Sequence, residues 1–533
     1  MKKIKLVGIL WVTLSSLPGL FQVAYCNEQT PSQRREVATI QISLQKIVHE
    51  SVVRNSSAMN DYLQAKMSQE QVLAEGGVFD TVFQTLLQSK RARSQNGAED
   101  AVNRHAYEYS DSTDSLEVGL SGLLPLGTLW DVTFNQNKRS SSSIDQYKSY
   151  HHEYDNGLKL TLTQPLLKGF GSKSTMSKIR LAELQSNIDS DKFEQKLMEL
   201  VGFTVQVYWK LYGAQQILNS WEKSLIIAED AIKDLKIRAE AGKIAQTEYL
   251  ENVSAVNIRK AELYNAKSKV DEAQNQLLTL LNISFADIKN AQLLAIDNPF
   301  ENRDMLQDAE SYINASISKW PEYRVARQKL EKERVQLKFL ENQLLPQLDL
   351  LGSFGSTSLD SSYDKSFRDL TDGRYLNWSA GLKFVFPLGN SLATSSLKIA
   401  RMRTKQAEIE LDAFTKSYGN SVHSKLSEVG NYQSQLQDLE NGLRIKTDLL
   451  EIERQKLKAG RTSLKTVLDK QDDYITYQRR VLSGIVNYKL AEASLDIAAG
   501  KILVKYGVDL QSLNYSDEAL SGRSGALFGE RIK

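Results

Sequence analysis

The chain has 533 residues, of which 41% are hydrophobic, and its formal net charge is only +2. A charge balance so close to neutral gives no electrostatic case for binding nucleic acid. A single cysteine excludes an intrachain disulfide framework and a cysteine-rich metal site, and eight prolines are compatible with long uninterrupted helices.

Residues 1–26 have the pattern of a secretory signal peptide. Three lysines among the first five residues precede an apolar stretch at 6–21, which serines and a proline interrupt. A transmembrane helix needs about 20 apolar residues, so this stretch is too short and too broken to be one. Residues 24–26 suit cleavage, and in the alternative interpretation Cys26 is the acylated residue of a lipoprotein. No later stretch is apolar enough for a membrane helix, so membrane insertion would have to use strands.

The first half of the chain continues with helices over 31–76, softly broken at Asn55, and with strands over about 79–165. The polar stretches 97–114 and 136–153 predict loops; the second contains two adjacent histidines and a glutamate, which are more typical of a solvated loop than of a metal site. Between these loops, apolar and polar residues alternate over 116–134 around a proline and a glycine, which predicts a hairpin.

The strand at 157–165 leads directly into a long helix. Leu158, Leu160 and Leu162 alternate with polar residues, so one face of this strand is apolar. Pro165 cannot donate to a strand ladder and marks the end of the strand. From Ser172 a helical pattern runs for about 70 residues, which corresponds to a rod of roughly 100 Å.

This helix has a 3.5-residue repeat of apolar residues, as helices in coiled coils do. The outbound seam consists of Leu218, Trp221, Leu225, Ala228, Ile232 and Leu235. The return seam consists of Tyr249, Val253, Val256, Leu263, Val270 and Leu277. We therefore predict an antiparallel helical hairpin over 172–283 that turns at Gly242.

The second half repeats this plan after an irregular connector at 284–302. Helices are expected over 303–344, strands over 345–387 around a polar loop at 356–377, and a second long hairpin over 391–507. That hairpin turns at Gly460, and its return helix spans 462–506; the tail 508–533 is polar.

Two motifs recur about 220 positions apart and indicate tandem repeats, 27–283 and 303–507. Residues 157–160 (GLKL) match 381–384 (GLKF), and residues 240–243 (EAGK) match 458–461 (KAGR). The first repeat is longer in its strand region by the segment that contains 116–134. The sequence therefore leaves open whether each chain contributes four or six strands.

Residues 164–171 (QPLLKGFG) resemble the strand-to-helix junction of TolC-type outer-membrane efflux proteins. The order and spacing of the other motifs extend this resemblance over nearly the whole mature chain. It implies a mainly α fold with a membrane β-barrel portion: a homotrimeric β-barrel in outer-membrane lipid that continues as an α-helical barrel across the periplasm of a Gram-negative bacterium. The implied function is the outer-membrane channel of a tripartite efflux or type I secretion system, with a periplasmic adaptor (membrane-fusion) protein and an inner-membrane pump as partners.

The strand patterns are consistent with such a duct. A four- or six-stranded sheet in hydrocarbon would leave unpaired edges, so several chains must contribute to a closed barrel. The apolar face would meet lipid, and it consists of Leu158, Leu160, Leu162, Trp378, Leu382, Phe384 and Phe386. A soluble β-sandwich with one buried face remains an alternative on strand pattern alone. No motif for catalysis or for a cofactor occurs, so no enzymatic activity is expected; the alternative function is a non-conducting coiled-coil tether of the envelope.

The resemblance also implies two kinds of functional residue. The glycines at the hairpin tips, Gly242 and Gly460, would dock the adaptor, although they could equally serve only the turn. The periplasmic gate of the family has two aspartates one helical turn apart. Asp469 matches the second of these, whereas Thr466 replaces the first.

Other residues could complete this gate. The missing charge could come from Asp472 or Asp473. Glu248 matches an acidic partner in the first repeat, and Arg461 or Thr462 lies near the bridging arginine of the family. The alternative is that Asp469 is one more solvated carboxylate of a coiled coil.

Overall fold

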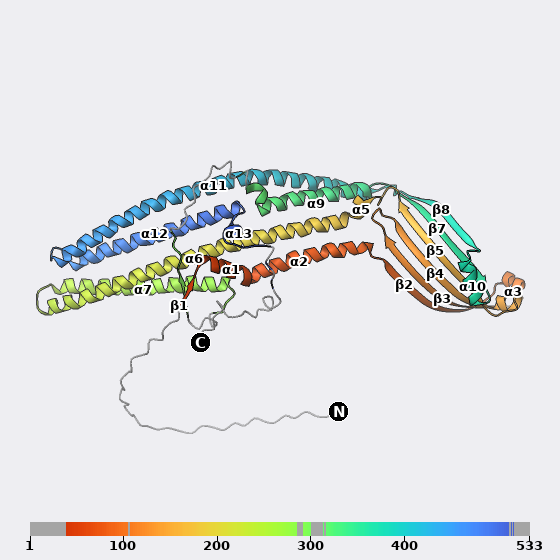
Figure 1. Cartoon of the computed structure of the whole chain (residues 1–533), viewed down its shortest axis with the longest axis horizontal. Helices are drawn as coiled ribbons and strands as arrows, with labels where there is room; N and C mark the ends of the chain where they lie inside the picture. Colours follow the sequence, from red (N-terminus) through yellow and green to blue (C-terminus); the bar gives the residue numbers. More distant parts are fainter. Residues whose placement is uncertain are drawn as a thin grey trace, which may run out of the picture.

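A computed structural model describes residues 39–104, 107–284, 291–299, 313, 316–510, 513 and 515. The predicted signal peptide with Cys26, residues 285–290 and 300–302 of the connector, and most of the helix expected before residue 316 lie outside the described residues. The molecule is elongated, with long helices at one end and a single large sheet at the other (Figure 1). None of the helices in the described part of the chain combines the length and the apolar character that crossing a lipid bilayer requires.

The large sheet has six antiparallel strands in the order β2-β3-β4-β5-β7-β8. They are β2 (Val82–Gln95), β3 (Glu108–Leu123), β4 (Leu129–Ser141), β5 (Glu153–Pro165), β7 (Gln347–Asp360) and β8 (Leu376–Val385). Both strands of the hairpin expected at 116–134 belong to this sheet, so the sheet of one chain has six strands. Strands β2 and β8 form its two edges.

The strands extend well into the stretches predicted as polar loops, and that part of the prediction is wrong. Short helices replace the rest of those loops: α3 (Ala98–Arg104), α4 (Ser142–Tyr147) and α10 (Tyr363–Thr371). Toward these ends of the strands the residues on both faces are polar, so the alternation of apolar and polar residues that marks a strand in the sequence is absent. The hydrogen-bonded pairing of the strands nevertheless continues there. Cross-strand ion pairs support it there, such as Arg91 with Asp114 at 2.9 Å and Arg139 with Asp111 at 3.0 Å.

The register of the sheet gathers the apolar side chains on one face. Leu160 lies opposite Val132 on one side and Phe354 on the other, and Phe354 lies opposite Trp378. Directly opposite residues of antiparallel strands project to the same face, so the alternation expected for β5 holds across its neighbours. We call this the apolar face, and its members include Phe83, Leu87, Leu116, Leu120, Trp130, Val132, Leu158, Leu160, Leu162, Leu350, Phe354, Trp378, Leu382 and Phe384.

The helices of the elongated part are α1 (Leu44–Arg54), α2 (Ser56–Gly76), α5 (Ser172–Thr175), α6 (Ser177–Glu240), α7 (Gln246–Leu280), α9 (Pro321–Gln343), α11 (Ser391–Lys458), α12 (Leu464–Ala498) and α13 (Ile502–Lys505). Asn55 separates α1 from α2, as expected, because its side chain accepts hydrogen bonds from the amides of Ser57 and Ala58. The last long helix ends earlier than predicted, since Gly500 adopts a φ of +65° and reverses the chain.

A small parallel ladder in the middle of the molecule was not predicted. Strand β1 (Thr39–Ile42) pairs with β6 (Gln292–Ala295), which lie in stretches expected to be helical and irregular. The ladder packs into a core with α1, α6 and α7 that includes Ile42, Leu211 and Leu277. Part of the tail also joins this core, because the Tyr515 hydroxyl donates to the carbonyl of Val52 at 2.8 Å.

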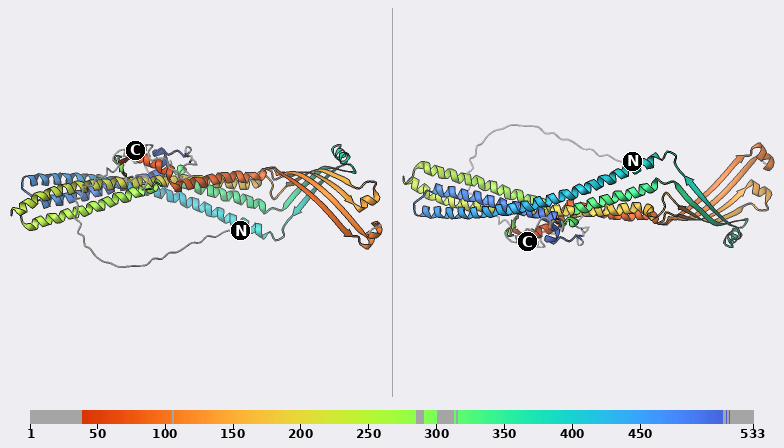
Figure 2. Two further views of the ribbon diagram at one scale, coloured as in Figure 1. Left: turned by 90° about the horizontal axis from the view of Figure 1, so that it is seen from below. Right: turned by 90° about the horizontal axis from the view of Figure 1, so that it is seen from above.

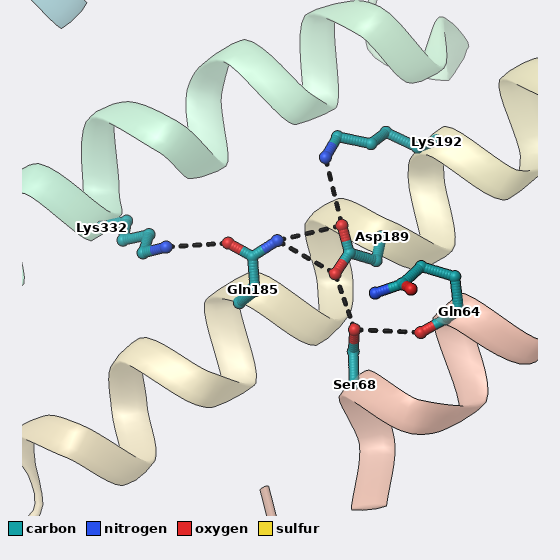
Figure 3. Close-up of polar contacts among 6 residues, drawn as sticks. All are labelled: Gln64, Ser68, Gln185, Asp189, Lys192 and Lys332. Atoms are coloured by element: carbon teal, nitrogen blue, oxygen red, sulfur yellow. Dashed lines mark hydrogen bonds and ion pairs between the residues drawn. The ribbon is translucent and has the colours of Figure 1, made fainter. Parts of the chain in front are cut away.

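A buried carboxylate joins the helices nearest the sheet (Figure 3). Asp189 of α6 accepts hydrogen bonds from Ser68 of α2 at 2.6 Å, from Gln185 at 2.9 Å and from Lys192 at 3.1 Å. The Gln185 side chain in turn accepts from Lys332 of α9 at 2.7 Å. Burial opposes the charge of Asp189, but these hydrogen bonds outweigh it and hold its pKa below the usual value.

Candidate functional site: the hairpin tips and the contacts between the hairpins

Both hairpin tips close with the same backbone geometry. Gly242 has a φ of +69°, and its amide donates to the carbonyl of Ala239 at 3.0 Å. The next amide, of Lys243, donates to the carbonyl of Arg238 at 2.8 Å. Gly460 has the same φ and the same pair of hydrogen bonds. This is a Schellman motif, which requires a left-handed residue at the glycine position. The turn alone therefore explains why both tips have a glycine.

Thr466, which the resemblance aligns with the first gate aspartate of the family, has a local role in the structure. Ser463 is the N-cap of α12, and its hydroxyl accepts from the Thr466 amide at 3.2 Å. The two hydroxyl groups also lie 3.0 Å apart. Thr466 thus belongs to the N-terminal cap of α12.

Asp469 and Glu248, the two carboxylates that the resemblance implies for the gate, form no hydrogen bond or ion pair with each other within the described part of the chain. Asp469 is exposed on α12, and Glu248 lies half-exposed in the first turn of α7. Within the described part of the chain, neither carboxylate has a hydrogen bond or an ion pair. Near the tip, Arg461 is exposed, and the Thr462 hydroxyl is hydrogen-bonded to the Glu453 carboxylate.

In the residues that the structure describes, three ion pairs link α12 to the neighbouring helices α7 and α11. Of the residues in these pairs, only Asp472 and Asp473 had been named from the sequence. Lys465 of α12 pairs with Glu251 of α7 at 2.9 Å, and both side chains are more than half exposed. Asp473 pairs with Lys446 of α11 at 3.0 Å. Asp472 pairs with an arginine of α7 that the sequence reasoning missed, Arg259, at 2.8 Å.

Arg259 is the most constrained charged group among these contacts, because only 2% of it is exposed. Its guanidinium donates to the Ser224 hydroxyl of α6 at 3.3 Å and to the backbone carbonyl of Leu468 of α12 at 3.0 Å. It also donates to the carbonyl of Ala255, one turn earlier in α7, at 3.0 Å. One side chain therefore links both helices of the first hairpin to the return helix of the second. We call this arrangement the Arg259 junction: Arg259, Ser224, Leu468 and Asp472.

The surroundings of the Asp472 carboxylate shift its pKa in opposite directions, and the upward shift is the larger. Partial burial raises the pKa of Asp472 above its ordinary value, the Arg259 guanidinium opposes that shift, and the neighbouring Asp469 and Asp473 carboxylates add to it. As the pH falls, Asp472 therefore takes up a proton before an ordinary exposed aspartate does. Protonation of Asp472 removes its ion pair with Arg259, whereas the hydrogen bonds of Arg259 to Ser224 and to the Leu468 carbonyl do not depend on that charge.

The heptad periodicity did not identify Arg259. The return seam alternates intervals of four and three residues from Tyr249 through Val253 to Val256, so the position expected before Leu263 is residue 260 and not 259. The burial of Arg259 depends on how α12 packs against the first hairpin, which the periodicity of one helix does not specify.

Comparison with known proteins shows to which family this chain belongs. The family model for the outer membrane efflux protein matches residues 131–282 and 313–501. The outer membrane protein OprJ of Pseudomonas aeruginosa is 23% identical over 303 residues, which is 56% of this chain; the chain spans 59% of the length of this curated relative.

Solved structures show the same fold. A membrane protein from Pseudomonas aeruginosa is similar with a TM-score of 0.62 and 17% identity, covering 86% of this chain and 92% of that one. The Campylobacter jejuni CmeC outer membrane channel is similar with a TM-score of 0.61 and 14% identity, covering 95% and 97% of the two chains. With its family model matched over more than half of its length, this chain belongs to the outer membrane efflux protein family and is an outer-membrane protein that extends into the periplasm.

Proposed function

We propose that three copies of this chain form a passive export duct, the outer-membrane channel of a tripartite efflux or type I secretion system. The duct would receive its cargo through a periplasmic adaptor protein from an inner-membrane pump. Membership of the family supports the place in the outer membrane and the role in efflux. The trimer and its partners are proposals.

The observation that carries this proposal is the six-stranded sheet. Its edge strands β2 and β8 are exposed along their whole lengths, so backbone groups on their outer sides have no partner strand within the described chain. Its apolar face is exposed as well, with 77% of Trp378 and 68% of Leu382 accessible. Pairing each edge with the next copy would close the sheet, place the apolar face against lipid and line the interior with polar residues such as Lys159 and Thr161.

The two halves of the chain have corresponding parts in this duct. We assign 27–283 and 303–507 as two structural repeats, each with helices, strands and one long hairpin. The matching tips at Gly242 and Gly460 support this assignment, since their backbone hydrogen bonds are the same. The hairpins would continue the duct into the periplasm.

Single-channel recording in planar bilayers tests the duct against the alternative of an envelope tether. We expect discrete conducting steps from the purified protein. A protein that inserts without passing current would support a non-conducting tether and overturn the duct.

The tips are proposed to dock the adaptor, with Ala241 and Ala459 beside the two glycines as test positions. Both alanines are exposed and have negative φ angles, so a larger side chain fits their backbone. We expect Ala459→Trp to abolish cross-linking to the co-expressed adaptor while trimer formation and conductance persist. Unchanged cross-linking and export in the double variant with Ala241→Trp would exclude the tips as the docking site.

The gate is proposed to lie just beyond the tips on α12. A threefold axis would bring three copies of Asp469 together into a focused negative site that favours cations. Exposed pairs such as Lys465–Glu251 are weak because water and salt screen their charges, so they resist opening only weakly. We expect Asp469→Asn combined with Glu248→Gln to change both the current and the cation preference, and unchanged values of both would refute this gate.

A further inference from the structure

The short helix α10 lies against the sheet at the end far from the long helices (Figures 1 and 2). Ser366, at the centre of the helix, is fully buried. Its hydroxyl donates to the Tyr154 carbonyl at 2.9 Å and accepts from the Asn156 amide at 2.9 Å. The carbonyl of Leu370 accepts from the Ser356 hydroxyl at 3.1 Å. These contacts fix α10 on strands β5 and β7.

The register shows which face of the sheet α10 covers. Asn156 lies opposite Ser358, and Ser356 lies opposite Leu158. Since side chains two apart in a strand share a face, Asn156 and Ser356 belong to the same face as Leu158. Helix α10 therefore lies on the apolar face, directly beyond its apolar residues, and not on the polar face that would line a duct.

A neighbouring copy of the chain that pairs with an edge of the sheet would not cover the exposed surface of α10. The helix lies over β5 and β7, and the ring of Phe367 contacts that of Phe134 in β4 with centroids 6.4 Å apart. The edges that would pair with other copies are β2 and β8. None of β4, β5 and β7 is an edge, so edge pairing leaves α10 uncovered.

The surface of α10 has two chemical parts. Tyr363 and Phe367 stack along one flank with ring centroids 6.0 Å apart, and they are 40% and 43% exposed. The outer side has exposed charges of both signs, with Asp364 beside Lys365 and Arg368. Among the described residues, neither basic side chain has a hydrogen bond or ion pair. Aromatic rings beside an apolar band, with charged groups further out, are the arrangement that the headgroup region of a bilayer favours.

We propose that α10 is an interfacial helix that anchors the sheet in the outer leaflet. Its aromatic flank enters the boundary between acyl chains and headgroups, and Lys365 and Arg368 bind the phosphate groups of the lipids. This inference rests on the proposed function only in requiring that the apolar face meets lipid.

Site-directed spin labelling of the full-length protein in vesicles tests separately whether the apolar face meets lipid and whether α10 lies at the membrane interface. In a Cys26→Ser background, single cysteines replace Phe367, Leu160 on the apolar face and Thr161 on the polar face. Each carries a nitroxide whose collisions with oxygen and with a water-soluble nickel chelate are measured. We expect an oxygen preference at 160, a nickel preference at 161 and an intermediate ratio at 367.

A water-like ratio at 367 together with a lipid-like ratio at 160 would overturn the interfacial helix and leave the duct standing. A water-like ratio at 160 would overturn the lipid-facing sheet itself. Tyr363→Cys provides a second position on the same flank if the substitution at 367 disturbs folding.

The basic pair is tested in the same way with lipids of different charge. We expect the label at 367 to show a larger oxygen preference in vesicles containing phosphatidylglycerol than in phosphatidylcholine alone. Lys365→Gln with Arg368→Gln should abolish that difference. A difference that persists in this double variant would overturn the assignment of these two residues to lipid phosphate.

Discussion

At the scale of single residues, the tip glycines differ from the other glycines of the long helices in their backbone. Gly460 has a φ of +69° with open space where a Cβ would stand, so an added methyl group meets no atom but must adopt a left-handed conformation. That conformation costs an L-residue roughly 1–2 kcal/mol. We therefore expect Gly460→Ala to lower the melting temperature of the protein, followed by circular dichroism.

The matched control for this prediction is Gly419→Ala inside α11. Gly419 also has open space around it, but its backbone is helical, where alanine is favoured over glycine by about 1 kcal/mol. The control should melt at the same or a higher temperature. Equal melting of the parent and Gly460→Ala would mean that the tip tolerates an L-residue.

Arg259 and its neighbour Lys260 provide a second comparison at this scale. Arg259 is buried and donates four hydrogen bonds, whereas Lys260 forms an exposed pair with Glu229 at 2.9 Å. Arg259→Met should destabilise the protein by about 2–3 kcal/mol, because buried acceptors lose a charged donor. Lys260→Met should cost less than about 1 kcal/mol. Chemical unfolding of the two variants measures both, and equal losses would contradict a special role for the Arg259 junction.

At the scale of elements, the sequence predicted where helices and strands occur better than where they end. The heptad seams lie in α6 and α7 of the first long hairpin, and Pro165 is the last residue of β5 as expected, whereas Gly500 ends the return helix of the second hairpin earlier than predicted. The strands ran further than expected because their outer thirds are polar on both faces, and the ladder there depends on backbone pairing and on pairs such as Arg91–Asp114. Contacts between elements, including the Arg259 junction, depend on packing that a period in one helix does not encode.

The Asp189 network leads to an element-scale prediction with a defined pH dependence. The folded pKa of Asp189 is lower than its unfolded value, so its charge stabilises the fold above the unfolded pKa, and that contribution is lost as the pH falls through the folded pKa. We expect Asp189→Asn to loosen α2 and α9 from α6 at neutral pH. Thermal unfolding should show a stability difference from the parent at pH 7 that shrinks in acid. A difference independent of pH would show that the charge has no role.

At the scale of the whole molecule, the resemblance that begins at the junction motif predicted the mainly helical fold that this chain shares with outer-membrane efflux channels, but the sequence left the strand number open. A hairpin such as 116–134 has the same alternation whether it joins a sheet or stands apart, so only the pairing of β3 with β2 and of β4 with β5 decides the question. We expect the protein extracted in detergent to have the mass of three chains. A stable single chain that conducts ions would contradict assembly of the pore from several copies.

The two unpaired edges have a genetic consequence. A subunit with a defective β8 but an intact β2 would still offer one pairing edge to its neighbours. It would enter the proposed ring of three chains and leave that ring open, so a single damaged copy would inactivate two sound ones. Edge mutations in this protein should therefore be dominant when they are co-expressed with the parent chain, whereas mutations that prevent folding altogether should be recessive.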